Sequence, residues 1–343
     1  MARLSPIENL SSPSALRTLT AALCVTLGSS LGAYENITLS SGITLSTLIV
    51  NPAADNTVVF LHGFPSGSYM WASILASPAL SAYRLVAPDL RGYNRSTVTP
   101  GVPSYSAALL AGDVAQLIVA VAGQGKRVFL VAHDWGGGIA WWLAAERPDL
   151  LLSLAIINMA HPSGWIEAVR TDAAQQAASA YVLSFVDPLF TAIATADDNA
   201  LLKSIFASET FWPRVEAAYE SSWEVAGTVD AALNYYRANI IPHCNLSCTE
   251  ASCWTQGVNS TFDVIPHGGV VEPSLPVLVQ WGLLDTAFDN DFQLAFIAEK
   301  VKGTLEVIKF ANASHWLPQE EPDAVASNLA AFFATISAGS PRV

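Results

Sequence analysis

Positively charged residues are scarce in this chain. Its 343 residues include 16 Lys and Arg against 29 Asp and Glu, which gives a net charge of −13. No Lys/Arg cluster is available to neutralise phosphates, so we expect no nucleic-acid partner, and an acidic surface repels anionic lipid headgroups. Charged residues make up 13% of the chain and hydrophobic residues 52%, which predicts a large buried core under a sparsely charged surface.

Cysteine is scarce too. Of the four cysteines, Cys24 lies near the N-terminus, and Cys244, Cys248 and Cys253 share one short loop. The loop can therefore form at most one disulfide and leaves one thiol over, with the pairing open. A zinc site that includes His243 is the alternative, but the spacings do not repeat a paired Cys-x-x-Cys motif. We expect no metal and no cofactor.

Internal repeats and long apolar runs are absent, apart from one apolar stretch near the N-terminus. Thr18 to Ala33 is uncharged, follows Arg17 and ends in small residues, as in the h-region of a signal peptide. We therefore predict that residues 1–33 form a signal or targeting segment, favouring the secretory pathway or the extracellular space. Because Glu8 is atypical of a signal peptide, an organelle transit peptide and an uncleaved membrane anchor remain alternatives, and this segment is the only part of the chain through which a membrane association is open. Sequons for a glycoprotein occur at Asn36, Asn94, Asn245, Asn259 and Asn312.

The most informative segment carries an acid between small residues. Val128 to Ala132 is a short β-branched run, and Ile139 to Glu146 has the pattern of a helix. Asp134 lies between them, so the segment predicts a nucleophile elbow, in which a strained turn holds one side chain above a sheet beside the first amides of a helix. A carboxylate there attacks a saturated carbon or a strained ring, whereas attack on an ester calls for Ser or Cys. The alternative is an ordinary helix N-cap.

Other predicted strands end at groups that would complete this site. The strand Thr57 to Leu61 leads into His62-Gly63-Phe64-Pro65, a loop that predicts an oxyanion hole from the backbone N–H groups of Phe64 and Trp135. The strands Leu275 to Trp281 and Leu305 to Phe310 are followed by Asp285 and His315.

The chain order is Asp134, Asp285, His315, which is the order of nucleophile, acid and base in α/β-hydrolases. Each residue follows a predicted strand, as catalytic groups of open parallel sheets do. The sequence therefore predicts an α/β fold with a mostly parallel sheet flanked by helices.

At this point the sequence resembles a known family, the epoxide hydrolases of the α/β-hydrolase fold, with haloalkane dehalogenases as close relatives. The resemblance runs from about Tyr34 to the C-terminal helix. It implies a hydrolase core over 34–160 and 273–343 and an inserted helical cap over 161–272 that contains the cysteine loop. Asn94 and Ala132 depart from the glycines common in relatives, and neither change removes a catalytic group. The motifs are His62-Gly63-Phe64-Pro65, Asp89-Leu90-Arg91-Gly92-Tyr93, His133-Asp134-Trp135-Gly136-Gly137 and Ser314-His315-Trp316.

Two tyrosines separate the epoxide hydrolases from their relatives. The family uses two cap phenols that hydrogen-bond the epoxide oxygen. Tyr181 lies in a matching Tyr-x-Leu-x-Phe-x-acid-Pro pattern, and Tyr236 lies in a matching Asn-aromatic-Tyr-Arg segment. We expect the neighbouring Tyr235 to be a packing residue.

The resemblance implies covalent chemistry without a cofactor. Asp134 attacks a ring carbon while Tyr181 and Tyr236 protonate the alkoxide. His315, oriented by Asp285, then activates a water that hydrolyses the ester and releases a vicinal diol.

The second step requires a neutral His315, so we expect its pKa to lie near or below the working pH. We expect Phe64, Trp135 and Trp316 to line the substrate pocket. The partners implied are a small-molecule epoxide and water, and the sequence indicates no protein partner.

Two alternatives stay open. A haloalkane dehalogenase would use the same aspartate with the Trp135 indole as a halide donor, but such enzymes usually add a second donor at the position of Phe64, whose side chain has none. A ligand-binding protein on the same scaffold that does not turn over is the other alternative.

Overall fold

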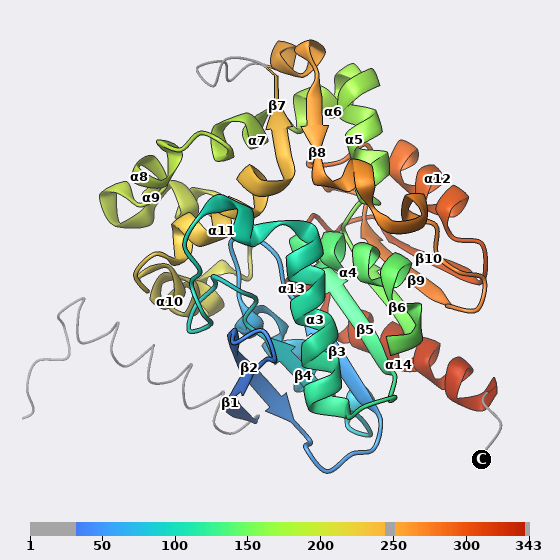
Figure 1. Cartoon of the computed structure of the whole chain (residues 1–343). Coiled ribbons are helices and arrows are strands. Elements are labelled where there is room, and N and C mark those ends of the chain that lie inside the picture. The colour runs from blue at the N-terminus through green and yellow to red at the C-terminus, as the bar shows by residue number, and fades with distance from the viewer. Residues whose placement is uncertain (1–31, 244–250, 340–343) are drawn as a thin grey trace, which may run out of the picture.

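The computed structural model describes residues 32–243 and 251–339, with the side chains of 251, 252, 255 and 337–339 left out (Figure 1). Eight strands among the described residues form one sheet in the order β1-β2-β4-β3-β5-β6-β9-β10. β2 pairs antiparallel with both of its neighbours, and the strands from β4 to β10 are parallel. Their bounds are β1 (Ala33–Thr38), β2 (Thr44–Val50), β3 (Thr57–Leu61), β4 (Arg84–Pro88), β5 (Val128–His133), β6 (Leu151–Ile157), β9 (Val277–Gly282) and β10 (Leu305–Phe310).

Helices cover both faces of this sheet and divide the core into two clusters. In β3, Val59 and Leu61 belong to the cluster that includes α3 and α4, whereas Val58 and Phe60 belong to the cluster that includes α2 and α14. Successive side chains of a strand point to opposite faces, so a strand buried on both faces needs the continuous apolar run found here. The helices are α2 (Ala72–Leu75), α3 (Ala107–Ala122), α4 (Trp135–Glu146), α12 (Asn290–Lys300), α13 (Leu317–Glu320) and α14 (Pro322–Gly339), with 3-10 turns η1 (Ser68–Trp71), η2 (Pro78–Leu80), η3 (Val102–Tyr105) and η4 (Pro148–Leu150).

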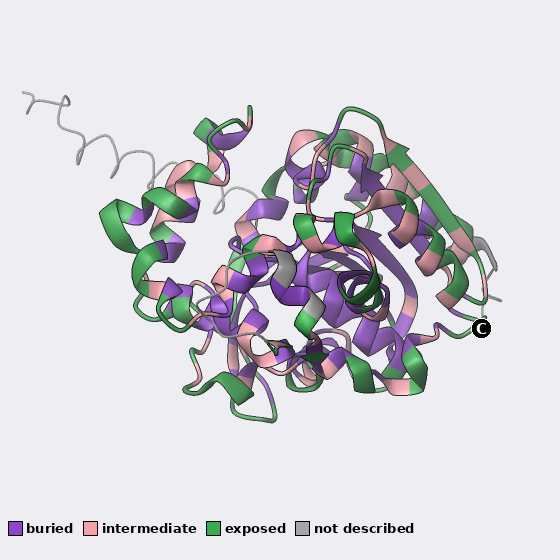
Figure 2. Cartoon of the chain, turned by 90° about the horizontal axis from the view of Figure 1, so that it is seen from above, coloured by how far each residue is buried: buried purple, intermediate pink, exposed green. Residues whose placement is uncertain are grey.

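A mostly helical segment separates β6 from β9, and we call it the cap. It also contains a two-stranded hairpin, which the sequence did not predict. The buried residues gather along the sheet and the helices beside it, while much of the outer helical surface is exposed (Figure 2). Its elements are α5 (Pro162–Thr171), α6 (Ala173–Ala178), α7 (Ala180–Phe185), α8 (Phe190–Ala194), α9 (Ala196–Ser204), α10 (Trp212–Trp223), α11 (Thr228–Asn239), β7 (Ile240–Pro242), η5 (Ala251–Gln256), β8 (Val258–Ser260), η6 (Thr261–Val264) and η7 (Pro266–Gly269).

The predicted fold class is confirmed, and two predicted strands have the bounds observed for β3 and β10. Most of the predicted targeting segment 1–33 lies outside the described residues, as do Cys244 and Cys248. Cys253 is disulfide-bonded. Within the described part of the chain, no helix combines the length and apolarity that a membrane span requires.

Candidate active site

Asp134 lies at the turn between β5 and α4, as the sequence predicts. Its backbone has φ 49° and ψ −127°, a conformation that is rare for a residue with a Cβ and that stores strain. Small neighbours are required here, because a Cβ on Gly136 would lie 2.5 Å from the Leu61 carbonyl oxygen and one on Gly137 would lie 2.7 Å from Met159. The turn therefore holds the carboxylate at the start of the helix.

Two backbone N–H groups act on the Asp134 carboxylate. The Phe64 N–H donates a 2.7 Å hydrogen bond to Oδ1, and the Trp135 N–H favours the charged form of this carboxylate and so lowers its pKa. Gly63 makes room for it, since a Cβ there would lie 2.1 Å from Oδ1. The two amides predicted for an oxyanion hole thus meet at one side chain.

The other two predicted members of the triad lie beside this carboxylate. His315 Nδ1 lies 2.8 Å from Asp285 Oδ2, and its Nε2 lies 3.6 Å from Asp134 Oδ2. The Asp285 side chain is fully buried, and its Oδ1 accepts a 2.8 Å hydrogen bond from the Ala287 N–H. The loops after β5, β9 and β10 therefore bring together a carboxylate, an imidazole and a second carboxylate in the expected order.

Asn158 is a site residue that the sequence analysis missed. Its Nδ2 donates to Asp285 Oδ2 at 2.8 Å, so this oxygen interacts with both Asn158 and His315. The Asn158 Oδ1 accepts from the Gly282 N–H at 2.9 Å. Asn158 follows β6 directly, and a polar residue at the carboxyl end of an apolar strand was the signal that could have found it.

His133 holds the backbone of His315 and was also missed as a site residue. Its Nε2 donates to the His315 carbonyl oxygen at 2.8 Å. Burial, together with the charge of His315, lowers the pKa of His133 to about 4, so the ring is neutral and keeps one N–H. This N–H makes the hydrogen bond to the His315 carbonyl oxygen.

The charges in the site oppose one of our expectations. Burial disfavours the imidazolium of His315, but the charge of Asp285 and interactions with Asp134 outweigh it and raise the pKa to about 10. The prediction of a pKa near or below the working pH is therefore wrong for this state, because two carboxylates flank the ring. Burial likewise favours the neutral form of Asp134, but interactions with His315 and the Trp135 N–H lower the pKa of its carboxyl below the ordinary value.

Both predicted phenols approach the elbow from the cap. Tyr181 lies on α7 and is 39% exposed, while Tyr236 lies buried on α11. Burial of the hydroxyl and the charge of Asp134 raise the pKa of each phenol, so both hydroxyls are neutral and close enough to feel the charge of the carboxylate. Tyr235 points away and donates a 2.7 Å hydrogen bond to the Arg91 carbonyl, which confirms its expected packing role.

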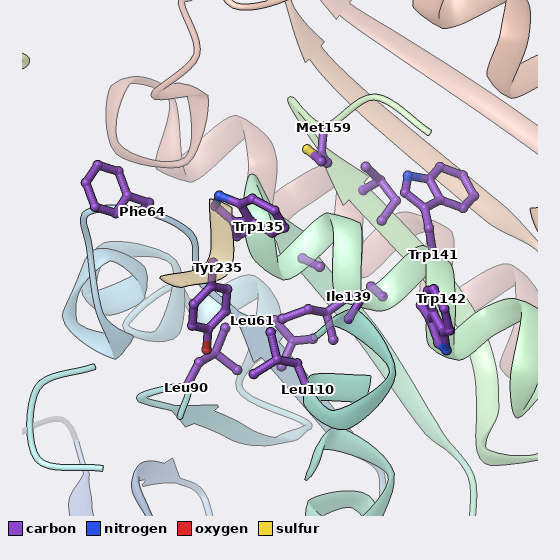
Figure 3. Packing of buried hydrophobic residues seen from close by; sticks show 14 of the residues in the cluster. Leu61, Phe64, Leu90, Leu110, Trp135, Ile139, Trp141, Trp142, Met159 and Tyr235 are labelled. Carbon is purple, nitrogen blue, oxygen red and sulfur yellow. The ribbon is translucent and has the colours of Figure 1, made fainter. Parts of the chain in front are cut away.

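Aromatic rings surround these phenols. Phe64 packs against the Tyr236 ring at a centroid distance of 5.5 Å, and Trp135 packs against it at 4.9 Å. Trp135 stands at the start of α4 near Phe64, with Trp141 further along the helix (Figure 3). Trp316, also predicted for the pocket, packs edge to face on the His315 ring at 4.9 Å. The assignment of these residues to a substrate pocket stays a prediction.

The described side chains offer no group of three or more His, Cys, Asp or Glu residues arranged to hold a metal ion. The described groups thus place a carboxylate at the elbow, with an imidazole beside it and two neutral phenols on the cap whose pKa values respond to its charge.

The fold and the elbow define the class of protein. A family model described as the alpha/beta hydrolase fold matches residues 56–322, and the chain belongs to this family. It is 29% identical over 288 residues to AB hydrolase superfamily protein YfhM of Bacillus subtilis, covering 82% of this chain and 92% of that protein. It is 29% identical over 305 residues to epoxide hydrolase 4 of Mus musculus, covering 85% and 77%.

Solved structures agree with these relatives. A crystal structure of Bacillus megaterium epoxide hydrolase in complex with an inhibitor matches with a TM-score of 0.74 at 29% identity, covering 88% of this chain and 100% of that chain. The resemblance to epoxide hydrolases, which are hydrolases acting on ether bonds, is therefore confirmed.

Proposed function

We propose that this protein hydrolyses an epoxide to a vicinal diol through a covalent ester on Asp134. The observation that carries the proposal is a carboxylate at the elbow with Oδ1 bound by the Phe64 N–H and Oδ2 beside His315. Elbows that attack carbonyl carbons carry Ser or Cys, whereas a carboxylate is suited to a saturated ring carbon. The names of the relatives support the same substrate class.

Ring opening forms a bond between one Asp134 oxygen and a ring carbon while the bond from that carbon to the epoxide oxygen breaks. The electron pair goes to that oxygen, which takes a proton from Tyr181 or Tyr236. A phenol is a useful donor here because its raised pKa keeps the proton in place until an alkoxide forms. The product of this step is a hydroxyalkyl ester.

Ester hydrolysis uses His315 and Asp285 rather than the cap phenols. Esterification removes the negative charge of Asp134, one of the two carboxylates that raise the pKa of His315, so this pKa falls and the imidazole can release its proton. Neutral His315, oriented by Asp285, then deprotonates a water that attacks the ester carbonyl carbon. The bond from that carbon to the alkyl oxygen breaks, and the departing diol oxygen takes the proton from His315. The Phe64 and Trp135 N–H groups stabilise the oxyanion on the former carboxylate.

A single-turnover experiment in oxygen-18 water tests the proposal. With enzyme in excess over a styrene-type epoxide, the first diol carries an oxygen from Asp134 and is unlabelled. Labelled diol in that first turnover would mean direct attack by water and would overturn the mechanism. Asp134→Ala abolishes diol formation beyond residual binding effects. Ester formation without release of diol would instead support the ligand-binding alternative. A panel of terminal, styrene-type and fatty-acid epoxides, compared with matched haloalkanes, tests the dehalogenase alternative, because a dehalogenase would turn over the haloalkanes in preference.

A further inference from the structure

A single carboxylate holds the residue before His315. Glu320, at the end of α13, accepts a 2.7 Å hydrogen bond from the Ser314 N–H on Oε2 and a second from the Ser314 hydroxyl on Oε1. The Ser314 Oγ also accepts from the Trp316 N–H at 3.1 Å. Both chain neighbours of His315 are therefore tied, directly or through Ser314, to Glu320.

The cap packs on this same loop. The Phe206 ring lies 4.6 Å from the Trp316 ring, centroid to centroid, and the Tyr219 hydroxyl donates to Gln319 Oε1 at 2.9 Å. Between these two cap residues lies Glu209, whose N–H donates to the Phe206 carbonyl at 2.9 Å. The Glu209 and Glu320 side chains interact, and this interaction raises the pKa of Glu209. An acidic residue of the cap thus contacts the acid that holds the His315 loop.

Two carboxyl groups can share a hydrogen bond only while one of them carries a proton. Burial, the charge of Glu320 and the hydrogen bond to it raise the pKa of Glu209 to about 7. Among the described residues, Glu320 is the charged group that acts on Glu209. Glu320 already accepts from both donors of Ser314, so the shared proton belongs on Glu209.

We propose that Glu320 is a positioning residue for His315 and that a proton shared with Glu209 links the His315 loop to the cap. The link exists at low pH. It is lost as the pH rises through the titration of Glu209, when two carboxylates face each other. The loop then keeps its contacts with Glu320, His133 and Phe206, but it loses the contact made through the shared proton and is less well fixed. The effect of this link on ester hydrolysis rests on the proposed function, in which His315 is the base.

Amide hydrogen exchange of the segment that contains His315 tests the link without any substrate. The protonated fraction of a group with a pKa of about 7 falls about tenfold between pH 6 and pH 8. After correction for intrinsic exchange, protection of this segment in the wild type is expected to fall in parallel. The amide of Glu209→Gln donates an N–H to Glu320 at both pH values, so the protection of the His315 segment in this variant is expected to stay constant. Glu321→Gln, at the exposed neighbouring acid, retains the wild-type pH dependence. Equal pH dependence in the wild type and Glu209→Gln would overturn the link.

Single-turnover kinetics test the positioning role. Glu320→Ala is expected to slow ester hydrolysis at least about tenfold and alkylation much less, because it frees the loop of the base. Glu320→Gln rescues most of the loss, since its amide accepts from the Ser314 N–H and donates to the Ser314 hydroxyl. A merely structural role would lower the unfolding temperature of Glu320→Ala without a change in the ratio of the two steps, and that result would overturn the proposal. If the wild type forms no ester at all, the proposed function fails, while the exchange experiment still decides the link.

Discussion

The Phe64 backbone N–H holds Oδ1 of Asp134 at 2.7 Å. This contact gives the two carboxylate oxygens different roles. Under the proposed mechanism, Oδ1 occupies the place where an oxyanion would form during ester hydrolysis, and Oδ2 would attack the substrate. The donor is in position before the reaction begins, so no reorganisation is needed when charge develops.

Gly63 tests this arrangement most directly. We expect Gly63→Ala to lower turnover by at least about a hundredfold, the effect of losing one oxyanion donor, because a Cβ at 2.1 Å from Oδ1 displaces the carboxylate or the loop. Gly112→Ala is the matched control, since a Cβ there meets nothing within 4 Å. This helix-interior change raises the free energy of unfolding by about 0.5 to 1 kcal/mol and leaves turnover unchanged. A Gly63→Ala variant with normal diol formation would contradict the oxyanion assignment.

Asn158 gives a second prediction. Its backbone has φ 43°, so Asn158→Gly removes the side chain and keeps an accessible backbone conformation. We expect a loss of about 1 to 3 kcal/mol in unfolding free energy, because the Gly282 N–H and Asp285 lose a buried partner. Ester hydrolysis slows more than alkylation, since Asp285 orients His315. Denaturant unfolding and single-turnover kinetics measure the two effects, and unchanged ester hydrolysis would show that Asp285 is oriented without Asn158.

The sequence was sufficient for features that depend on local pattern. The buried apolar run of β3 and the carboxylate at the elbow could be read directly, because strand burial and turn sterics act over a few residues. The start of α4 could not be read from the sequence in this way. The helix begins at Trp135 rather than Ile139, because close approach to the Leu61 carbonyl requires the glycines that a propensity argument excludes from helices.

The rest of the site depends on partners that are distant in the chain. Asn158 and Asp285 are separated by 127 positions, and His133 and His315 by 182. No periodicity connects such residues. The pKa of His315 was misjudged for the same reason, because it depends on two carboxylates that only the folded chain brings to the ring. The roles of the five catalytic residues stay predictions for experiment.

Removal of the base should trap the covalent intermediate. His315→Gln is expected to open the ring and then accumulate the ester, because water is no longer activated. Mass spectrometry then shows an adduct of one substrate mass on the peptide that contains Asp134. The double variant His315→Gln/Asp134→Ala is the control and carries no adduct. Wild-type steady-state turnover by His315→Gln would remove His315 from the mechanism.

The raised pKa of His315 predicts how stability depends on pH. Folding raises this pKa from an ordinary value of 6.5 to about 10, so the folded state binds the proton more tightly. The resulting stabilisation is complete below pH 6.5 and is lost as the pH rises toward 10. The difference in unfolding free energy between the wild type and His315→Gln should therefore shrink from pH 6.5 to pH 10. Denaturant titrations across this range measure it, and a constant difference would contradict an imidazolium paired with the two carboxylates.

The two cap phenols distinguish an epoxide hydrolase from a dehalogenase. An epoxide oxygen leaves as an alkoxide and needs a proton, whereas a halide is a weak base that needs only hydrogen bonds. Tyr181→Phe and Tyr236→Phe are each expected to slow alkylation about ten- to a thousandfold, which corresponds to roughly 1.4 to 4 kcal/mol in the transition state. The double variant should be nearly inactive, while hydrolysis of a preformed ester changes much less.

Tyr235→Phe is the matched control for these variants, because it removes a neighbouring hydroxyl on the same helix that donates to the Arg91 carbonyl at 2.7 Å. We expect it to lower the free energy of unfolding by about 1 to 3 kcal/mol and to leave the alkylation rate constant close to that of the wild type. Rapid-quench measurement of ester formation with a styrene-type epoxide gives the alkylation rate constant of each variant, and so distinguishes the effects of the two cap phenols from that of Tyr235. Wild-type epoxide turnover by the double variant, or faster turnover of haloalkanes that resists both Tyr→Phe changes, would replace the epoxide hydrolase proposal with the dehalogenase.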